Sequence, residues 1–440
     1  MLVNRPLILL IFGVLYAGLP AEAQNAGSEP SAERWSVHFQ ATSIGQHHGS
    51  FPALYEGENS LPSHPENRVS LTATVFLTYR VNSWTELVVN PEIAGGKGFG
   101  QVTGIAGFPN GEIPRVATAT PTPYVARAYL KNTWALSPET EMVEGGANKL
   151  TGRLPVCRFT LINGKFAITD FFDNNTYSHD PRRQFMNWSL MSNGAWDYPA
   201  DTRGYTIGSV QELTMRGWSL RAATMMEPTE ANGGTFDTRL AKNRGVAVEW
   251  EKRYKPMGHA GALRVLGFLN RERAGTFRDA ILPDGTTDLA STRRPGTKKY
   301  GFGLNVEQEI TRDIGAFARY GWSDGKTEAW AFTQIDRSVS GGISVQGRLW
   351  KRTGDNIGVA AARNYLSGDD RRFLAAGGMG FIVGDGRLNY APESIAEAYY
   401  AWRAIRDWTF TLDYQRVVNP AYNRDRGPVS VGTLRVHWER

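Results

Sequence analysis

One stretch of the chain, Gly164 to Tyr205, holds most of the residues suited to recognising a polar solute. Apolar ring faces stack on the C–H faces of a sugar, while amides, carboxylates and guanidinium groups exchange hydrogen bonds with its hydroxyls. Polar loop residues also stabilise their own loop through Asx-turns, caps and ion pairs, and Asp173-Asn174-Asn175 fits turn formation best. The candidate solute contacts in this stretch are Asp170, Asp173, Asn174, Asn175, Arg182, Arg183 and Trp188.

The same stretch begins and ends like β-strand and has a long loop between, at about residues 170–203. Loops of this length in a compact fold are usually functional or disordered, and this one is too aromatic for disorder. A short patch, Arg183 to Ser192, has a helical appearance. We therefore expect an ordered loop that folds inward and narrows a pore.

Strand-like alternation of apolar and polar residues runs through the rest of the chain. Residues 67–80 are the clearest case, and the pattern predicts strands with one apolar and one polar face. Seventeen segments qualify, but a single-chain bacterial barrel needs an even number, so 16 strands are expected, with 18 as the alternative. The candidates are 34–42, 67–80, 84–93, 124–130, 158–168, 204–213, 218–226, 246–250, 263–269, 300–306, 314–322, 328–335, 343–349, 357–361, 395–402, 408–414 and 429–438.

The connections between these segments alternate in length. Short links separate some pairs, while the others are joined by long loops, which is typical of outer-membrane barrels. Many Trp and Tyr residues fall near strand ends, where amphipathic rings prefer the headgroup boundary; the alternative is that they are core residues of a soluble β-sandwich. The predicted fold is all-β: a transmembrane antiparallel up-and-down β-barrel with long extracellular loops. The long loops are 95–123, 170–203, 228–243, 274–297 and 367–392.

The N-terminus predicts export. Arg5 precedes the apolar run Leu7–Leu19 and an A-x-A site ends at Ala23, so residues 1–23 are expected to be a signal peptide rather than a membrane anchor. Residues 24–33 are then a flexible arm and residues 34–440 the barrel. The predicted location is the bacterial outer membrane, in contact with its lipid.

Composition argues against several other classes of protein. A net charge of +6 is spread along the chain and forms no basic stripe, so no nucleic-acid partner is expected. The single cysteine, Cys157, cannot form an intramolecular disulfide. The seven His residues lack metal-ligand spacing, and no Ser–His motif supports a hydrolase. We therefore expect no metal, no cofactor and no enzymatic activity.

Four further residues lie on the polar side or at the ends of predicted strands: Arg80, Glu92, Arg127 and Arg158. Such positions face the lumen of a barrel. A sugar that crosses a narrow pore sheds water, and opposed Arg and carboxylate groups replace those hydrogen bonds without holding the sugar tightly.

Three blocks of sequence resemble the carbohydrate-selective porins of bacterial outer membranes (OprB type). They begin at Gly164 (GKFAITDFFDNNTYSHDPRRQFMNWSLMSNGAWDYPADTRGYT), Phe373 (FLAAGGMGFIVGDGRLNYAPESIAEAYYAW) and Leu412 (LDYQRVVNPAYNRDRGPV). The resemblance implies one barrel, usually of 16 strands, an inward-folded loop, and diffusion of glucose-type monosaccharides without a cofactor. The family usually ends on an aromatic residue, whereas here Trp438 is followed by Glu439 and Arg440.

Two alternatives to a small-sugar porin stay open at this point. One is a barrel of the same build that passes polar solutes in general or a polysaccharide, and the other is an outer-membrane enzyme or exported soluble β-protein. The sequence also leaves open whether barrels associate into homo-oligomers.

Overall fold

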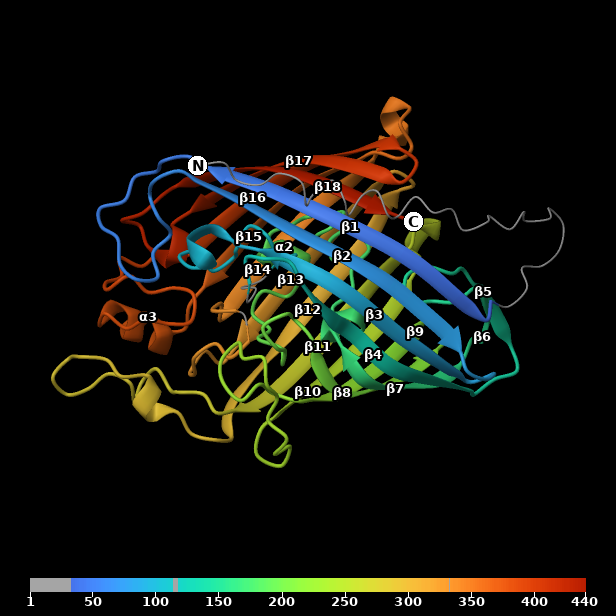
Figure 1. The fold of residues 1–440 in the computed structure, drawn as a ribbon, viewed down its shortest axis with the longest axis horizontal. Coiled ribbons are helices and arrows are strands. Elements are labelled where there is room, and N and C mark those ends of the chain that lie inside the picture. The colour runs from blue at the N-terminus through green and yellow to red at the C-terminus, as the bar shows by residue number, and fades with distance from the viewer. Residues whose placement is uncertain (1–32, 114–117, 332) are drawn as a thin grey trace.

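The computed structural model describes residues 33–113, 118–331 and 333–440. Sixteen strands in antiparallel register form a closed barrel, with β1 pairing β18 to complete the ring (Figure 1). The predicted signal peptide, 1–23, and all but Glu33 of the predicted arm, 24–33, lie outside the described residues. The barrel strands are β1 (Trp35–His48), β2 (Glu66–Arg80), β3 (Thr85–Gly96), β4 (Thr122–Ala135), β7 (Arg158–Phe166), β8 (Thr206–Met215), β9 (Trp218–Met225), β10 (Arg244–Tyr254), β11 (Gly261–Glu272), β12 (Thr297–Thr311), β13 (Ile314–Ser323), β14 (Arg337–Gln346), β15 (Asn356–Tyr365), β16 (Glu393–Ile405), β17 (Trp408–Val418) and β18 (Val429–Glu439).

The alternation of residue types explains which face of each strand looks outward. In β2, Val69 and Leu77 are 64% and 37% exposed on the outer face, whereas Thr72 and Thr74 are buried on the inner face. An apolar exterior and a polar interior is the arrangement that a barrel in lipid requires. The prediction of an up-and-down barrel is confirmed, and the soluble β-sandwich alternative is wrong.

One predicted strand, residues 328–335, is a loop between β13 and β14. Its described residues are all buried instead of alternately exposed, because the segment packs inside the mouth of the barrel. Trp330 is typical: it is 1% exposed, and its backbone N–H donates to Asp197 at 2.7 Å. Removing this segment from the seventeen candidates leaves the even number that a closed barrel needs.

One pair of strands was not predicted from the sequence. β5 (Thr140–Val143) and β6 (Gly152–Pro155) form a separate two-stranded sheet between β4 and β7. This hairpin lies at the end of the barrel that carries the short turns, called the turn end below; the long loops gather at the opposite, loop end (Figure 1).

Helical structure is sparse within the described residues. The predicted helical patch 183–192 is a single turn, α2 (Trp188–Met191), whose N-cap Asn187 accepts a hydrogen bond from Ser189 N. The longer α3 (Gly368–Ala375) lies in the loop before β16. No helix in the described ranges is both long and apolar enough to cross a bilayer. The short 3-10 turns are η2 (Phe99–Gln101), η3 (Ile168–Asp170), η4 (Pro256–Gly258), η5 (Ala290–Thr292), η6 (Gly347–Trp350) and η7 (Pro420–Tyr422).

The largest apolar cluster lies inside the barrel and joins two long connections to the wall. The first is residues 167–205, between β7 and β8, called the inner loop below. The second is residues 97–113, which follow β3 and are called the companion segment. Phe172 and Trp196 of the inner loop are 0% and 1% exposed in this cluster, so the inner loop is packed like a core.

Candidate pore constriction

Glycines on the inner face of the wall leave space into which side chains of the inner loop pack. At each of these glycines an added Cβ would collide with a side chain of the loop. Absent side chains therefore let the loop approach the strands closely. The contacts between a wall glycine and a loop side chain are Gly245 with Pro199, Gly303 and Gly321 with Asn193, Gly315 with Tyr177, and Gly358 with Phe185.

A buried ion pair anchors the two arms of the inner loop to β13. Arg319 Nε lies 3.2 Å from Asp173 Oδ1, and the two side chains are 2% and 5% exposed. The same guanidinium donates to the carbonyl oxygens of Ser178 at 2.6 Å and Leu190 at 2.8 Å. Because Ser178 lies on the outgoing arm and Leu190 on the returning arm, one side chain holds both.

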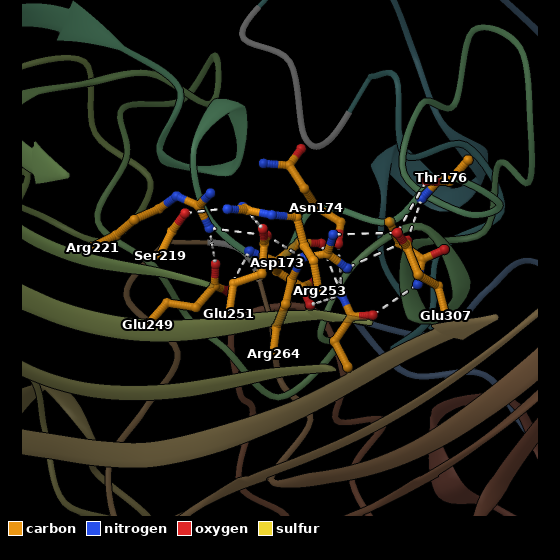
Figure 2. Close-up of polar contacts among 12 residues, drawn as sticks. Asp173, Asn174, Thr176, Ser219, Arg221, Glu249, Glu251, Arg253, Arg264 and Glu307 are labelled. Atoms are coloured by element: carbon orange, nitrogen blue, oxygen red, sulfur yellow. Dashed lines mark hydrogen bonds and ion pairs between the residues drawn. The ribbon is translucent and has the colours of Figure 1, made fainter. Parts of the chain in front are cut away.

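Carboxylates of the wall bind the backbone of the inner loop (Figure 2). Glu249 Oε2 accepts from Asp173 N at 2.8 Å, and Glu307 Oε2 accepts from Thr176 N at 2.6 Å. Arg221 pairs with Glu249 at 3.0 Å, and Arg264 pairs with Glu307 at 3.3 Å (Figure 2). The arginines therefore compensate the charges that hold the loop.

The tip of the inner loop is fixed to the opposite part of the wall. Glu397 accepts from the backbone N–H groups of Met186 at 2.6 Å and Asn187 at 2.9 Å. Arg435 donates to the carbonyl oxygens of Pro181 and Gln184, both at 2.7 Å. The loop therefore crosses the barrel interior and is held on both sides, as an inward-folded constriction loop must be.

The companion segment packs against this tip. Phe108 stacks on Trp188 with ring centroids 5.2 Å apart and an interplanar angle of 20°. Glu393 of β16 accepts from the N–H groups of Ala106 at 3.0 Å and Gly107 at 2.7 Å. Trp188 is only 1% exposed, so its ring stabilises the loop core and presents no face to a solute, contrary to the expected role.

Arg182 at the loop tip joins two carboxylates across the interior. Its guanidinium lies 3.2 Å from Glu92 of β3 and 2.7 Å from Glu112 of the companion segment. Burial raises the pKa of Glu112 above its ordinary value, while the charge of Arg182 opposes that rise and Glu92 adds to it. Tyr205 donates to Glu92 at 3.0 Å, and Tyr124 also donates to this carboxylate.

A second charge pair lies beside the first. Arg127 of β4 makes a two-pronged contact with Asp170, with Nε to Oδ2 at 2.7 Å and Nη2 to Oδ1 at 2.6 Å. The Arg127 guanidinium carbon also lies 5.3 Å from the centroid of the Tyr205 ring. The side chains of Arg127, Arg182 and Asp170 keep 13%, 17% and 25% of their surface exposed, so they remain within reach of a solute.

The residues that meet around Arg182 and Arg127 form what we call the constriction cluster. They combine guanidinium groups, carboxylates, one ammonium and two phenol rings. Lys165 belongs to the set because it pairs with Asp201 at 3.3 Å and lies 5.8 Å from the Tyr205 ring centroid. The members are Glu92, Glu112, Tyr124, Arg127, Lys165, Asp170, Arg182, Asp201, Arg203 and Tyr205.

A polar hollow of about 530 Å³ lies at the loop end. Lys97, Gln101 and Thr202 are among its lining residues. Thr202 is followed by Arg203, whose guanidinium carbon lies 4.0 Å from the centroid of the Tyr124 ring. One lining residue of the hollow, Thr202, is therefore the chain neighbour of a member of the constriction cluster.

The structure gathers some of the predicted site residues and separates others. Glu92, Arg127, Asp170 and Arg182 meet in the constriction cluster. Asp173 and Asn175 are buried anchors of the loop, and Asn175 donates to Asn305 at 2.7 Å. Asn174 is half-buried beside them, with its carbonyl oxygen 3.2 Å from Asn305 Nδ2.

Three predicted arginines lie away from the cluster. Arg80 pairs with Glu86 at 3.4 Å, near the turn between β2 and β3. Arg158 pairs with Glu141 of the hairpin at 3.0 Å, and Arg183 pairs with Glu439 near the C-terminus at 2.6 Å.

Several members of the cluster escaped the sequence analysis. Glu112 lies in the companion segment, where no strand pattern marks it. Tyr124 does not follow the apolar–polar alternation of β4, because the register between β3 and β4 shifts at Asn90 and Pro91. Tyr205 was seen only as the end of a strand, although an aromatic residue next to a long polar loop is a signal that could have been used.

Most of the chain matches the model of a known protein family. The model for the carbohydrate-selective porin, OprB family, matches residues 61–439. The chain belongs to the carbohydrate-selective porin (OprB) family. The resemblance inferred from the three sequence blocks is confirmed, and the chain is a β-barrel porin of the bacterial outer membrane.

Solved structures agree with the fold. OprB of Pseudomonas putida, in its high-pH structure, aligns with a TM-score of 0.67 and 14% identity over 92% of this chain and 94% of that chain. The outer membrane channel DcaP of Acinetobacter baumannii aligns with a TM-score of 0.53 and 8% identity over 94% and 100%. At these identities the likeness shows the fold alone. No curated protein sequence matches the chain.

Proposed function

We propose that this porin lets glucose-type monosaccharides diffuse through the constriction cluster into the periplasm. The observation that supports the proposal is the pairing of partly exposed guanidinium and carboxylate groups with two phenol rings, at the place where the inner loop faces β3 and β4. A hexose offers hydroxyls around its edge, and the partly exposed charged groups fit that edge.

The arrangement also suits rapid release. Arg182 and Arg127 are already paired with carboxylates, so a sugar hydroxyl exchanges with existing hydrogen bonds and gains less than it would from an unpaired guanidinium. Weak binding at a narrow point is the condition for selective conduction. The same opposed charges set a field across the pore that orients a polar solute.

Export by the N-terminal segment 1–23 is part of the proposal, since a barrel of this family has to reach the outer membrane. The outward-facing Trp84 and Trp134, 47% and 39% exposed with ring centroids 5.7 Å apart, are placed to meet lipid headgroups on the periplasmic side. The long loops then face the outside of the cell.

The test is block of channel current by sugar in planar bilayers, for the wild type and Arg182→Ala. Glucose should block wild-type current. A hydrogen bond to a charged group contributes about 1.5–3 kcal/mol, so loss of Arg182 should raise the half-blocking concentration at least about tenfold. Arg406→Ala is the matched control because its side chain is 95% exposed in a turn outside the cluster.

Liposome swelling with glucose, maltose and longer oligosaccharides separates the proposal from a general channel. Swelling rates should fall steeply beyond the monosaccharide. Equal block by sugars and by unrelated polar solutes, unaffected by Arg182→Ala, would point to the alternative of a general polar-solute or polysaccharide channel.

A further inference from the structure

The hairpin β5–β6 reaches back into the barrel from the turn end. Asn90 Nδ2 donates to Asn148 Oδ1 at the hairpin tip, at 2.7 Å. Asn90 lies on the inner face of β3, because it is 0% exposed while its neighbours in the outward phase, Leu87 and Ile93, are 37% and 38% exposed. A tip residue that bonds to Asn90 therefore lies inside the wall.

The position of Asn90 places this contact beside the constriction cluster. Asn90 is the cross-strand partner of Arg127, and it comes two residues before Glu92 in a strand that runs from the turn end to the loop end. The hairpin tip thus lies next to the constriction cluster on its turn-end side, whereas the inner loop forms that cluster from the loop end.

The tip is a closed, ordered turn. Gly146 N donates to Lys149 O at 2.9 Å, and Lys149 N donates to Gly146 O at 3.0 Å. Asn148 adopts φ of 61°, a left-handed conformation that Asn tolerates better than most residues. Leu150 is 4% exposed, so the tip is packed and does not project freely into solvent.

The base of the hairpin is clamped as well. Arg158 pairs with Glu141 at 3.0 Å and donates to Pro155 O at 2.8 Å. Arg216, in the turn between β8 and β9, pairs with Glu139. Ordering at both base and tip is expected of a fixed obstruction, since a mobile linker would lack these contacts.

We propose that the β5–β6 hairpin is a second selectivity element of the channel, a turn-end narrowing placed in series with the constriction cluster. It limits the size of the sugar that leaves the cluster, and Lys149 puts one exposed positive charge at its tip. The inference rests on the proposed passage of small sugars through the cluster.

The direct test shortens the tip and leaves the base in place. Replacing residues 144–151 with Asn-Gly joins β5 and β6 by a two-residue hairpin turn. If the two narrowings contribute equally in series, KCl conductance should rise about twofold, because the tip residues 144–151 leave the lumen and one of the two resistances is lost. Swelling with maltotriose should rise more than swelling with glucose.

The matched control replaces residues 347–354, the turn between β14 and β15, with the same Asn-Gly link. That turn carries Leu349, 60% exposed, and its ion pairs go to Asp313 in a neighbouring turn and to Asp355 next to β15. Its conductance should equal that of the wild type. Wild-type conductance and an unchanged size limit in the shortened hairpin would overturn the proposal.

A second measurement covers the case in which the shortened protein does not fold. Asn90→Cys with Asn148→Cys, in a Cys157→Ser background, should be joined in the folded barrel by a short bis-methanethiosulfonate, which forms a disulfide with each thiol and releases methanesulfinate, and the variant should keep wild-type conductance. Failure to crosslink places the tip elsewhere and overturns the proposal. Ion conductance and crosslinking do not depend on sugar block, so the hairpin and the proposed sugar specificity can fail separately.

Discussion

Removing Arg319 tests whether the wall holds the inner loop in the pore. Arg319 contacts the loop at Asp173, Ser178 and Leu190, while its own backbone stays in the β12–β13–β14 ladder. Arg319→Met removes the charge and keeps much of the bulk. The barrel should therefore form normally, and the substitution should destabilise only the docking of the inner loop against the wall.

The free-energy cost of removing Arg319 follows from the burial of its ion pair with Asp173. With the two side chains 2% and 5% exposed, removing one partner leaves Asp173 as an uncompensated buried charge, which costs about 3–5 kcal/mol. At about 1.4 kcal/mol per factor of ten, the equilibrium between docked and undocked loop shifts by roughly 100-fold to a few thousand-fold. In the double variant Arg319→Met/Asp173→Asn neither charge remains, so part of the loss should be recovered.

Single-channel recording is the assay. Arg319→Met should give larger and noisier conductance with weaker glucose block, and the double variant should move back toward the wild type. Arg253→Met is the control, because among the described residues the Arg253 side chain bonds to the wall alone, at Ser219, Glu251 and nearby carbonyls. If Arg319→Met keeps wild-type conductance and glucose block, the idea that this ion pair positions the loop is refuted.

Two more predictions concern a wall glycine that contacts the inner loop and the buried carboxyl group of Glu227. Gly321→Ala should loosen the inner loop and raise conductance, because the new Cβ collides with Asn193, whereas Gly267→Ala in β11 meets no atom within 4 Å and should behave as the wild type. Burial and the neighbouring Glu272 raise the pKa of Glu227 well above its ordinary value, so its contribution to stability is present below about pH 4.3 and is lost as the pH rises. Glu227→Gln should therefore raise the melting temperature in detergent at pH 8 and change it little at pH 4; an equal effect at both pH values would contradict this reasoning.

The barrel could be predicted from sequence because its signal is local. Period-2 alternation reports the two faces of a strand, and it identified the sixteen barrel strands that the structure contains. Residues 328–335 were predicted to be a strand because a fully buried loop is as rich in apolar residues as a strand. The hairpin β5–β6 was missed because its strands of four residues are too short for a periodic pattern.

The constriction was harder to predict because it depends on contacts between distant segments. Glu92, Glu112 and Arg182 come from three separate parts of the chain, and their meeting follows from where the inner loop docks. Trp188 looked like a sugar-stacking residue by type, yet Phe108 of the companion segment covers its ring. Residue type therefore indicated which kinds of polar group the loop carries but did not indicate which side chains face the pore.

The most direct measurement is titration of single-channel current with glucose, in the wild type and in Arg182→Ala side by side. Saturable block in the wild type, weakened at least about tenfold by the substitution, is the expected result. Current that is indifferent to glucose in both proteins would contradict the claim that the inner loop forms a sugar-recognising constriction.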